Sequence, residues 1–139
     1  MSKKLARLLS GLFVSMVAAT IVSVATPAHA AYATCNVSGT IYNHDNVLTA
    51  IPKNSTTGVT CQMRNGNYDN NAVRVLQTSL NKCYYFNLVV DGDFGTATEN
   101  AVRYVQRVEG VTETGVYDPT LRVNMRWFPK DQAICAYVD

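Results

Sequence analysis

A turn motif made of glycine and an aromatic residue occurs twice in the second half of the chain, and it restricts the fold more than any other feature. The copies are Asp91-Gly92-Asp93-Phe94-Gly95 and Thr114-Gly115-Val116-Tyr117-Asp118. Glycine suits the positive φ of a tight turn, and the aromatic residue can close the end of a core. The residues expected to shape the two turns are Asp91, Gly92, Phe94, Gly95, Gly115 and Tyr117.

Apolar residues recur at helical spacing in three segments, over about 72–80, 97–108 and 121–128. Asp118 and Pro119 suit the start of the third helix, and Pro129 should end it. Gln77 and Gln106 each follow an apolar residue, where a glutamine can bond loop backbone as part of the scaffold. These patterns predict a mainly α fold, a small three-helix bundle with an internal pseudo-repeat.

The segment before these helices differs from them in composition. It is rich in threonine, serine, asparagine and glycine, with short β-type runs near 37–42 and 58–62 and no helical period. We interpret it as an irregular or β-hairpin-like arm. The predicted organisation is a signal peptide (1–30), the N-terminal arm (31–68), the helical domain (69–130) and a C-terminal tail (131–139).

The first thirty residues have the pattern of a cleavable signal peptide. Lys3, Lys4 and Arg7 precede an apolar run, and Ala28 and Ala30 are small residues at positions −3 and −1 from a cut. A membrane anchor is the alternative, disfavoured by polar residues in the run and by the lack of a charged stop-transfer sequence. We therefore expect a secreted or cell-wall-associated protein that leaves the membrane after cleavage.

The positive charge of the chain comes from this signal. The full chain has 12 basic and 10 acidic residues. Cleavage removes three basic residues and no acidic one, so nine basic and ten acidic residues remain, a net charge of −1. A nucleic-acid partner requires a clustered basic surface, which this composition argues against.

Four cysteines follow the signal, and an even number in an exported chain favours two disulfides. Three pairings are possible. We favour Cys35–Cys61, which would staple the arm, and Cys83–Cys135, which would tie the tail to the domain. The wide spacing and the single histidine after the signal, His44, argue against zinc, and we expect no metal or cofactor.

Several motifs of the helical segment form a series that belongs together: Val73-Arg74-Val75-Leu76-Gln77, Asp91-Gly92-Asp93-Phe94-Gly95, Thr98-Glu99-Asn100-Ala101-Val102, Gln106, Gly110 and Thr114-Gly115. Over about residues 66–126 this series resembles the peptidoglycan-binding domain family, the three-helix module attached to bacterial cell-wall hydrolases. The resemblance implies a compact bundle with a pseudo-repeat that binds peptidoglycan.

The chain departs from the family pattern at three places. Thr96 stands where the family usually has proline, and Val105 where it usually has an aromatic residue. The run 118–121 replaces a Gly-Pro-x-Thr-Trp-like sequence. These departures bear on the ligand surface rather than on the fold.

Aromatic residues and arginines are the candidates for ligand binding, because sugars stack on aromatic faces and arginine pairs with carboxylates in a bidentate way. The alternative is that the tyrosines fill the core and the arginines are solvated. The candidates are Tyr84, Tyr85, Arg103, Tyr104 and Arg107.

No residue pattern predicts catalysis. His44 lies in a polar turn, and turn or capping roles account for Asp91, Asp93 and Glu99. The Asp91-Gly92-Asp93 spacing also differs from that of a calcium loop.

The leading hypothesis is a secreted, monomeric, non-enzymatic module that binds peptidoglycan, alone or in trans with a secreted cell-wall enzyme. The second is a secreted protein-interaction or inhibitor domain on the same scaffold, favoured by the departures and the extra arm. The third is a minimal cell-wall hydrolase that uses Asp91 or Glu99.

Overall fold

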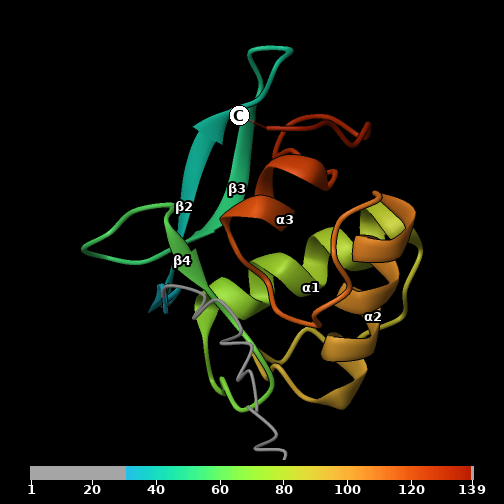
Figure 1. Ribbon diagram of the computed structural model, residues 1–139. Helices are drawn as coiled ribbons and strands as arrows, with labels where there is room; N and C mark the ends of the chain where they lie inside the picture. Colours follow the sequence, from blue (N-terminus) through green and yellow to red (C-terminus); the bar gives the residue numbers. More distant parts are fainter. Residues whose placement is uncertain (1–30, 139) are drawn as a thin grey trace, which may run out of the picture.

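The computed structural model describes residues 31–138, so the predicted signal peptide lies outside the described residues. A β-hairpin lies on one side of the molecule and the helices on the other (Figure 1). None of the described helices is long and apolar enough to cross a membrane. In chain order the elements are β1 (Ala33–Thr34), β2 (Val37–Tyr42), β3 (Leu48–Lys53), β4 (Cys61–Gln62), α1 (Asn71–Tyr84), α2 (Thr96–Val108) and α3 (Pro119–Asn124).

The N-terminal arm contains a regular antiparallel hairpin. β2 pairs with β3 from Val37–Lys53 at one end to Tyr42–Leu48 at the other. β3 packs against α1, and Ile51 on this strand is fully buried. The sequence predicts β2 but not β3, because alanine, proline and lysine are poor strand formers and hide the pattern.

The expected mainly α class is not confirmed, since helices account for 31% and strands for 25% of the structure. The third helix is also shorter than its spacing predicts. It ends at Asn124 because Met125 has an extended backbone and Trp127 then pairs with the tail. The backbone N–H of Trp127 donates to the carbonyl of Ala136 at 2.8 Å.

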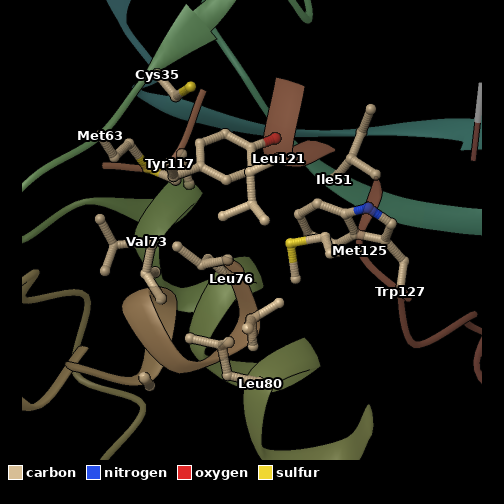
Figure 2. Packing of buried hydrophobic residues seen from close by; sticks show 14 of the residues in the cluster. Cys35, Ile51, Met63, Val73, Leu76, Leu80, Tyr117, Leu121, Met125 and Trp127 are labelled. Carbon is tan, nitrogen blue, oxygen red and sulfur yellow. The ribbon is translucent and has the colours of Figure 1, made fainter. Parts of the chain in front are cut away.

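One hydrophobic cluster joins the arm, the helices and the tail (Figure 2). Tyr117 and Trp127 meet edge-on in it, with ring centroids 5.9 Å apart. The arm is therefore part of the core. Buried members from the different segments include Cys35, Ile51, Met63, Leu76, Leu80, Val105, Tyr117, Leu121, Trp127 and Val138.

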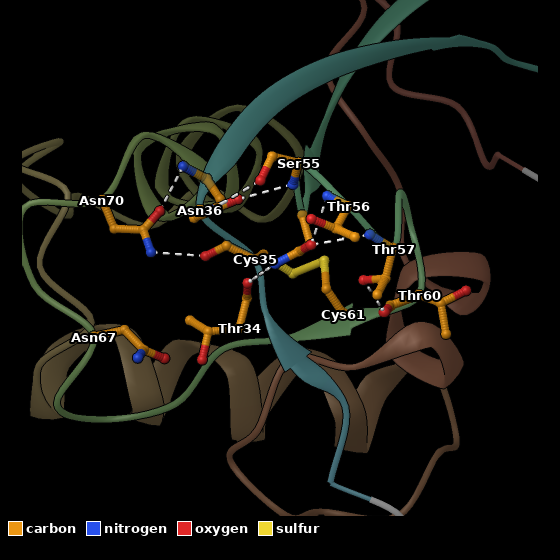
Figure 3. Close-up of a disulfide and its surroundings, with 12 residues drawn as sticks. Thr34, Cys35, Asn36, Ser55, Thr56, Thr57, Thr60, Cys61, Asn67 and Asn70 are labelled. Atoms are coloured by element: carbon orange, nitrogen blue, oxygen red, sulfur yellow. Dashed lines mark hydrogen bonds between the residues drawn. A yellow bond between two sulfur atoms is a disulfide. The ribbon is translucent and has the colours of Figure 1, made fainter.

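The structure contains the disulfides Cys35–Cys61 and Cys83–Cys135, which is the pairing favoured from the sequence. Around the first, Asn70 links the arm to α1 (Figure 3). Its side chain donates to the carbonyl of Cys35 at 2.7 Å and accepts from the N–H of Ala72 at 2.8 Å, which caps the helix. The second disulfide ties the end of α1 to the tail.

Candidate functional site

The first glycine turn is held by a buried glutamine on α1. The N–H of Gly92 donates to Oε1 of Gln77 at 3.0 Å. Nε2 of Gln77 donates to the carboxylate of Asp91 at 2.9 Å and to the carbonyl of Asp93 at 3.1 Å. The turn before α2 is therefore fixed by the helix that precedes it.

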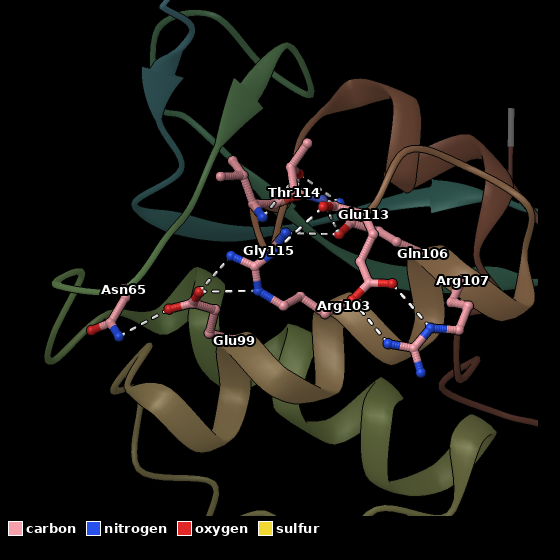
Figure 4. Close-up of polar contacts among 9 residues, drawn as sticks. Asn65, Glu99, Arg103, Gln106, Arg107, Glu113, Thr114 and Gly115 are labelled. Carbon is pink, nitrogen blue, oxygen red and sulfur yellow. Dashed lines mark hydrogen bonds and ion pairs between the residues drawn. The ribbon is translucent and has the colours of Figure 1, made fainter.

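The second turn repeats this arrangement on α2 (Figure 4). The N–H groups of Thr114 and Gly115 donate to Oε1 of Gln106 at 2.9 and 2.8 Å. Nε2 of Gln106 donates to the Thr114 hydroxyl and to the carbonyl of Val116, both at 2.9 Å. The scaffold role predicted for the two glutamines is confirmed.

Both turn glycines have a positive φ, 86° at Gly92 and 75° at Gly115. A side chain there would also meet an arginine of the preceding helix, because Arg74 and Arg103 lie 2.8 Å from the positions of the missing Cβ atoms. Conformation and close approach thus both call for glycine.

The aromatic residues of the turns close the core as predicted, since Phe94 and Tyr117 are fully buried. The arm runs along both of them. Met63 forms a β-bridge with Tyr117, and Asn67 forms one with Phe94. The stretch 63–67 of the arm therefore pairs with both turns and connects them.

The two arginines predicted as ligand contacts lie in ion pairs (Figure 4). Arg103 donates to the carboxylate of Glu99 at 2.8 and 3.2 Å. Arg107 makes a bidentate pair with Glu113 at 2.9 and 3.0 Å, which lowers the pKa of Glu113 and raises that of Arg107. Arg107 is the more exposed of the two.

Tyr84 is a structural residue, which corrects its prediction as a ligand contact. Its hydroxyl donates to Glu109 at 2.6 Å and accepts from the N–H of Arg126 at 2.7 Å. The Arg126 guanidinium covers its ring at 4.8 Å from the centroid. Burial and the bond to Glu109 raise the pKa of Tyr84 above its usual range, and its ring is buried, so no free face remains for a sugar.

Other predicted residues lie on a surface that we call the aromatic face, which we define as Phe86, Tyr104, Arg107 and Val108 together with Tyr85, the chain neighbour of Phe86. Tyr85 is 90% exposed and Tyr104 is 46% exposed. Phe86 joins the loop to α2, because its ring meets that of Tyr104 edge-on at 5.4 Å. Arg107 and Val108 follow Tyr104 by three and four residues on the same side of the helix.

The carboxylates considered for catalysis have structural partners. Asp91 accepts from Gln77 and from the backbone of Asp93, and Glu99 accepts from Arg103 and Asn65. These bonds lower the pKa of both groups, whereas a glycosidase acid needs a raised pKa. Within residues 31–138, no group of three or more metal-ligating side chains comes together.

The structure also contains a hollow that the sequence does not indicate. It is lined by His44, Glu109, Val123, Asn124, Tyr137 and Val138 and has a volume of about 550 Å³. These residues come from the hairpin tip, the ends of α2 and α3, and the tail. No local pattern in the sequence brings such distant segments together.

A comparison with known protein families finds a match in the helical segment. Residues 69–123 match the family described as "Putative peptidoglycan binding domain". The resemblance of this segment to the peptidoglycan-binding domain family is confirmed by this match. The arm and the tail lie outside the matched range of this family.

Among solved structures, the chain is similar to a peptidoglycan-binding protein from Clostridioides difficile in complex with glutamine hydroxamate. The identity is 26%, the TM-score is 0.47, and the match covers 63% of this chain. The chain spans 58% of the length of that protein. A comparison with curated proteins gives no match.

The departures from the family pattern are compatible with the family scaffold. Val105 is fully buried in the core, and Thr96 is exposed at the start of α2. Asp118, in the altered run, caps α3 by accepting from the N–H of Leu121 at 2.8 Å.

Proposed function

We propose that this protein binds bacterial cell-wall peptidoglycan outside the cytoplasm and does not cleave it. The match of residues 69–123 to the peptidoglycan-binding family carries the proposal. The two disulfides support an oxidising compartment, where such bonds persist. The lowered pKa values of Asp91 and Glu99 support binding without hydrolysis.

The aromatic face is the proposed contact surface. Tyr85 and Tyr104 present exposed rings against which the apolar face of a sugar can pack. Arg107 already makes a bidentate pair with Glu113, which shows that its guanidinium can take a carboxylate in this geometry. A carboxylate of the peptide stem could replace Glu113 there.

Co-sedimentation of the secreted form with purified, insoluble peptidoglycan tests the proposal. We expect the protein to pellet with the wall material at low salt. Tyr104→Ala should weaken binding about three- to tenfold, as expected for loss of one aromatic contact. Tyr68→Ala is the matched control, because Tyr68 is 61% exposed and lies outside the aromatic face.

Complete recovery in the supernatant would refute the proposal. A stable complex with another secreted protein, without affinity for the wall, would instead support the interaction or inhibitor domain. Release of soluble wall fragments during the incubation would show a hydrolase.

A further inference from the structure

The hollow around Glu109 is built largely by parts of the chain outside residues 69–123. His44 comes from the hairpin tip, and Tyr137 and Val138 come from the tail. The tail lies beside α3 and reaches the hairpin tip, where Asn43 and Val138 form a β-bridge (Figure 1). The arm and the tail therefore add a hollow to the family domain.

A largely buried carboxylate lies in this hollow. The Glu109 side chain is only 13% exposed. Among the described residues, its hydrogen-bond donors are two phenols, Tyr84 at 2.6 Å and Tyr137 at 3.1 Å. Arg126 forms an ion pair with Glu109, with its Nε 3.7 Å from Oε1, and its guanidinium also stacks on Tyr84. Oε1 of Glu109 thus has a phenol and a guanidinium beside it, and Oε2 has the neutral phenol of Tyr137. A carboxylate oxygen can accept a further hydrogen bond.

Two helix C-termini add partial negative charge around Glu109. Glu109 caps the C-terminus of α2, and α3 ends at Asn124 on the wall of the same hollow. The carbonyl ends of helices carry partial negative charge. The Asn124 side chain donates its Nδ2 to the carbonyl of Thr120 at 2.8 Å, which leaves its oxygen as the acceptor end of the amide.

Size and wall chemistry indicate an organic cation. A volume of about 550 Å³ fits a small organic group rather than a bare ion. Val123 and Val138 provide apolar walls, and the partly exposed ring of Tyr137 can lie against an alkyl chain or a cation. An ammonium group at the end of an alkyl chain matches both the carboxylate and the apolar walls.

We infer that this hollow binds the side-chain ammonium of a diamino acid in the peptide stem of peptidoglycan. The inference rests on the proposed function. It adds a contact for the peptide stem, supplied by the arm and the tail, to the aromatic face on the family domain.

Two soluble peptides test the inference on the secreted form of the protein. One is a stem pentapeptide that contains lysine, and the other is the same peptide with the lysine Nε-acetylated. Titration followed by NMR should show shifts at Glu109 and Tyr137 with the first peptide, and roughly ten- to hundredfold weaker binding of the second. Equal affinity for both peptides, or no binding of either, would overturn the inference.

Glu109→Gln gives a second test, because glutamine keeps one oxygen that can accept from a phenol but removes the charge. We expect the same loss of affinity for the lysine peptide and no loss for Asp69→Asn. Asp69 is a matched control, since it is an exposed carboxylate that does not line the hollow, and asparagine tolerates its φ of 44°. If the Glu109 variant does not fold, the comparison of the two peptides on the unaltered protein still tests the inference.

The inference and the proposed function fail in different ways. If acetylated wall material pellets the protein as well as untreated material, and both peptides bind equally, the hollow is not the stem site although the protein binds peptidoglycan. If the lysine peptide binds selectively but the protein does not pellet with the wall, the proposed function fails and the ammonium site stands.

Discussion

The two glycine turns share one scaffold but differ in the residue that precedes each glycine. In the first turn the carboxylate of Asp91 accepts from Gln77 and from the N–H of Asp93. In the second, the hydroxyl of Thr114 accepts from Gln106 and from the N–H of Val116, at 2.9 and 3.1 Å. A neutral oxygen thus occupies the place of a charged one, so the position of the acceptor shapes the turn and its charge is secondary.

Replacing the glutamines should have the largest effect. Gln77→Ala and Gln106→Ala each leave buried turn N–H and acceptor groups without partners, and each should lower the free energy of unfolding by about 3 kcal/mol. Urea denaturation measures this, with exposed Gln132 changed to alanine as the control. If only one of the two variants loses less than about 1 kcal/mol of unfolding free energy, the two glutamines contribute unequally to stability.

Alanine at the turn glycines should destabilise the two turns unequally. A positive φ costs a non-glycine residue about 1–2 kcal/mol, and Gly110→Ala measures this alone, because Gly110 has a φ of 72° and open space around it. Gly115→Ala adds contact with the flexible Arg103 side chain. Gly92→Ala adds contact with Arg74 and also with the backbone nitrogen of Asn70 at 3.0 Å.

Thermal and urea unfolding should therefore show the largest loss of stability for Gly92→Ala, a smaller loss for Gly115→Ala and the smallest for Gly110→Ala. Equal losses at all three positions would mean that φ alone sets the cost and that the crowding around Gly92 is relieved without penalty.

The smallest effect should be a difference in pH dependence between the turns. Hydrogen bonds from the backbone of Asp93 and from Gln77 lower the pKa of Asp91. The stability that this provides is present above the unfolded pKa, about 3.9, and is lost as the pH falls through the lower folded value. Asp91→Thr, which copies the second turn, should therefore lose less stability than the unaltered protein on acidification.

Urea denaturation at a series of pH values from 7 to about 2 checks this. Glu99 and Glu113 also have lowered pKa values and contribute over the same range in both proteins, so the difference between the two curves reports Asp91. Parallel curves would show that the carboxylate charge contributes nothing to the turn.

Local patterns predicted much of the fold. The turn motifs, the glutamines and the Asp118 cap depend on residues close in the chain, and the structure has them as predicted. Strand β3 was missed because its pairing with β2 outweighs weak strand propensity. The third helix was predicted too long because a bridge to the tail competes for its last residues.

The sequence by itself determined the two turns and the helices that they start, since a positive φ, a cap and an apolar stripe act over a few residues. Only the tertiary structure decided which tyrosine is exposed. Tyr84 and Tyr85 are neighbours, yet one is buried against Glu109 and the other faces solvent. The hollow around Glu109 was likewise decided by contacts between the hairpin, the helix ends and the tail. Burial and electrostatics at such sites depend on segments that are distant in the chain, and only packing brings them together.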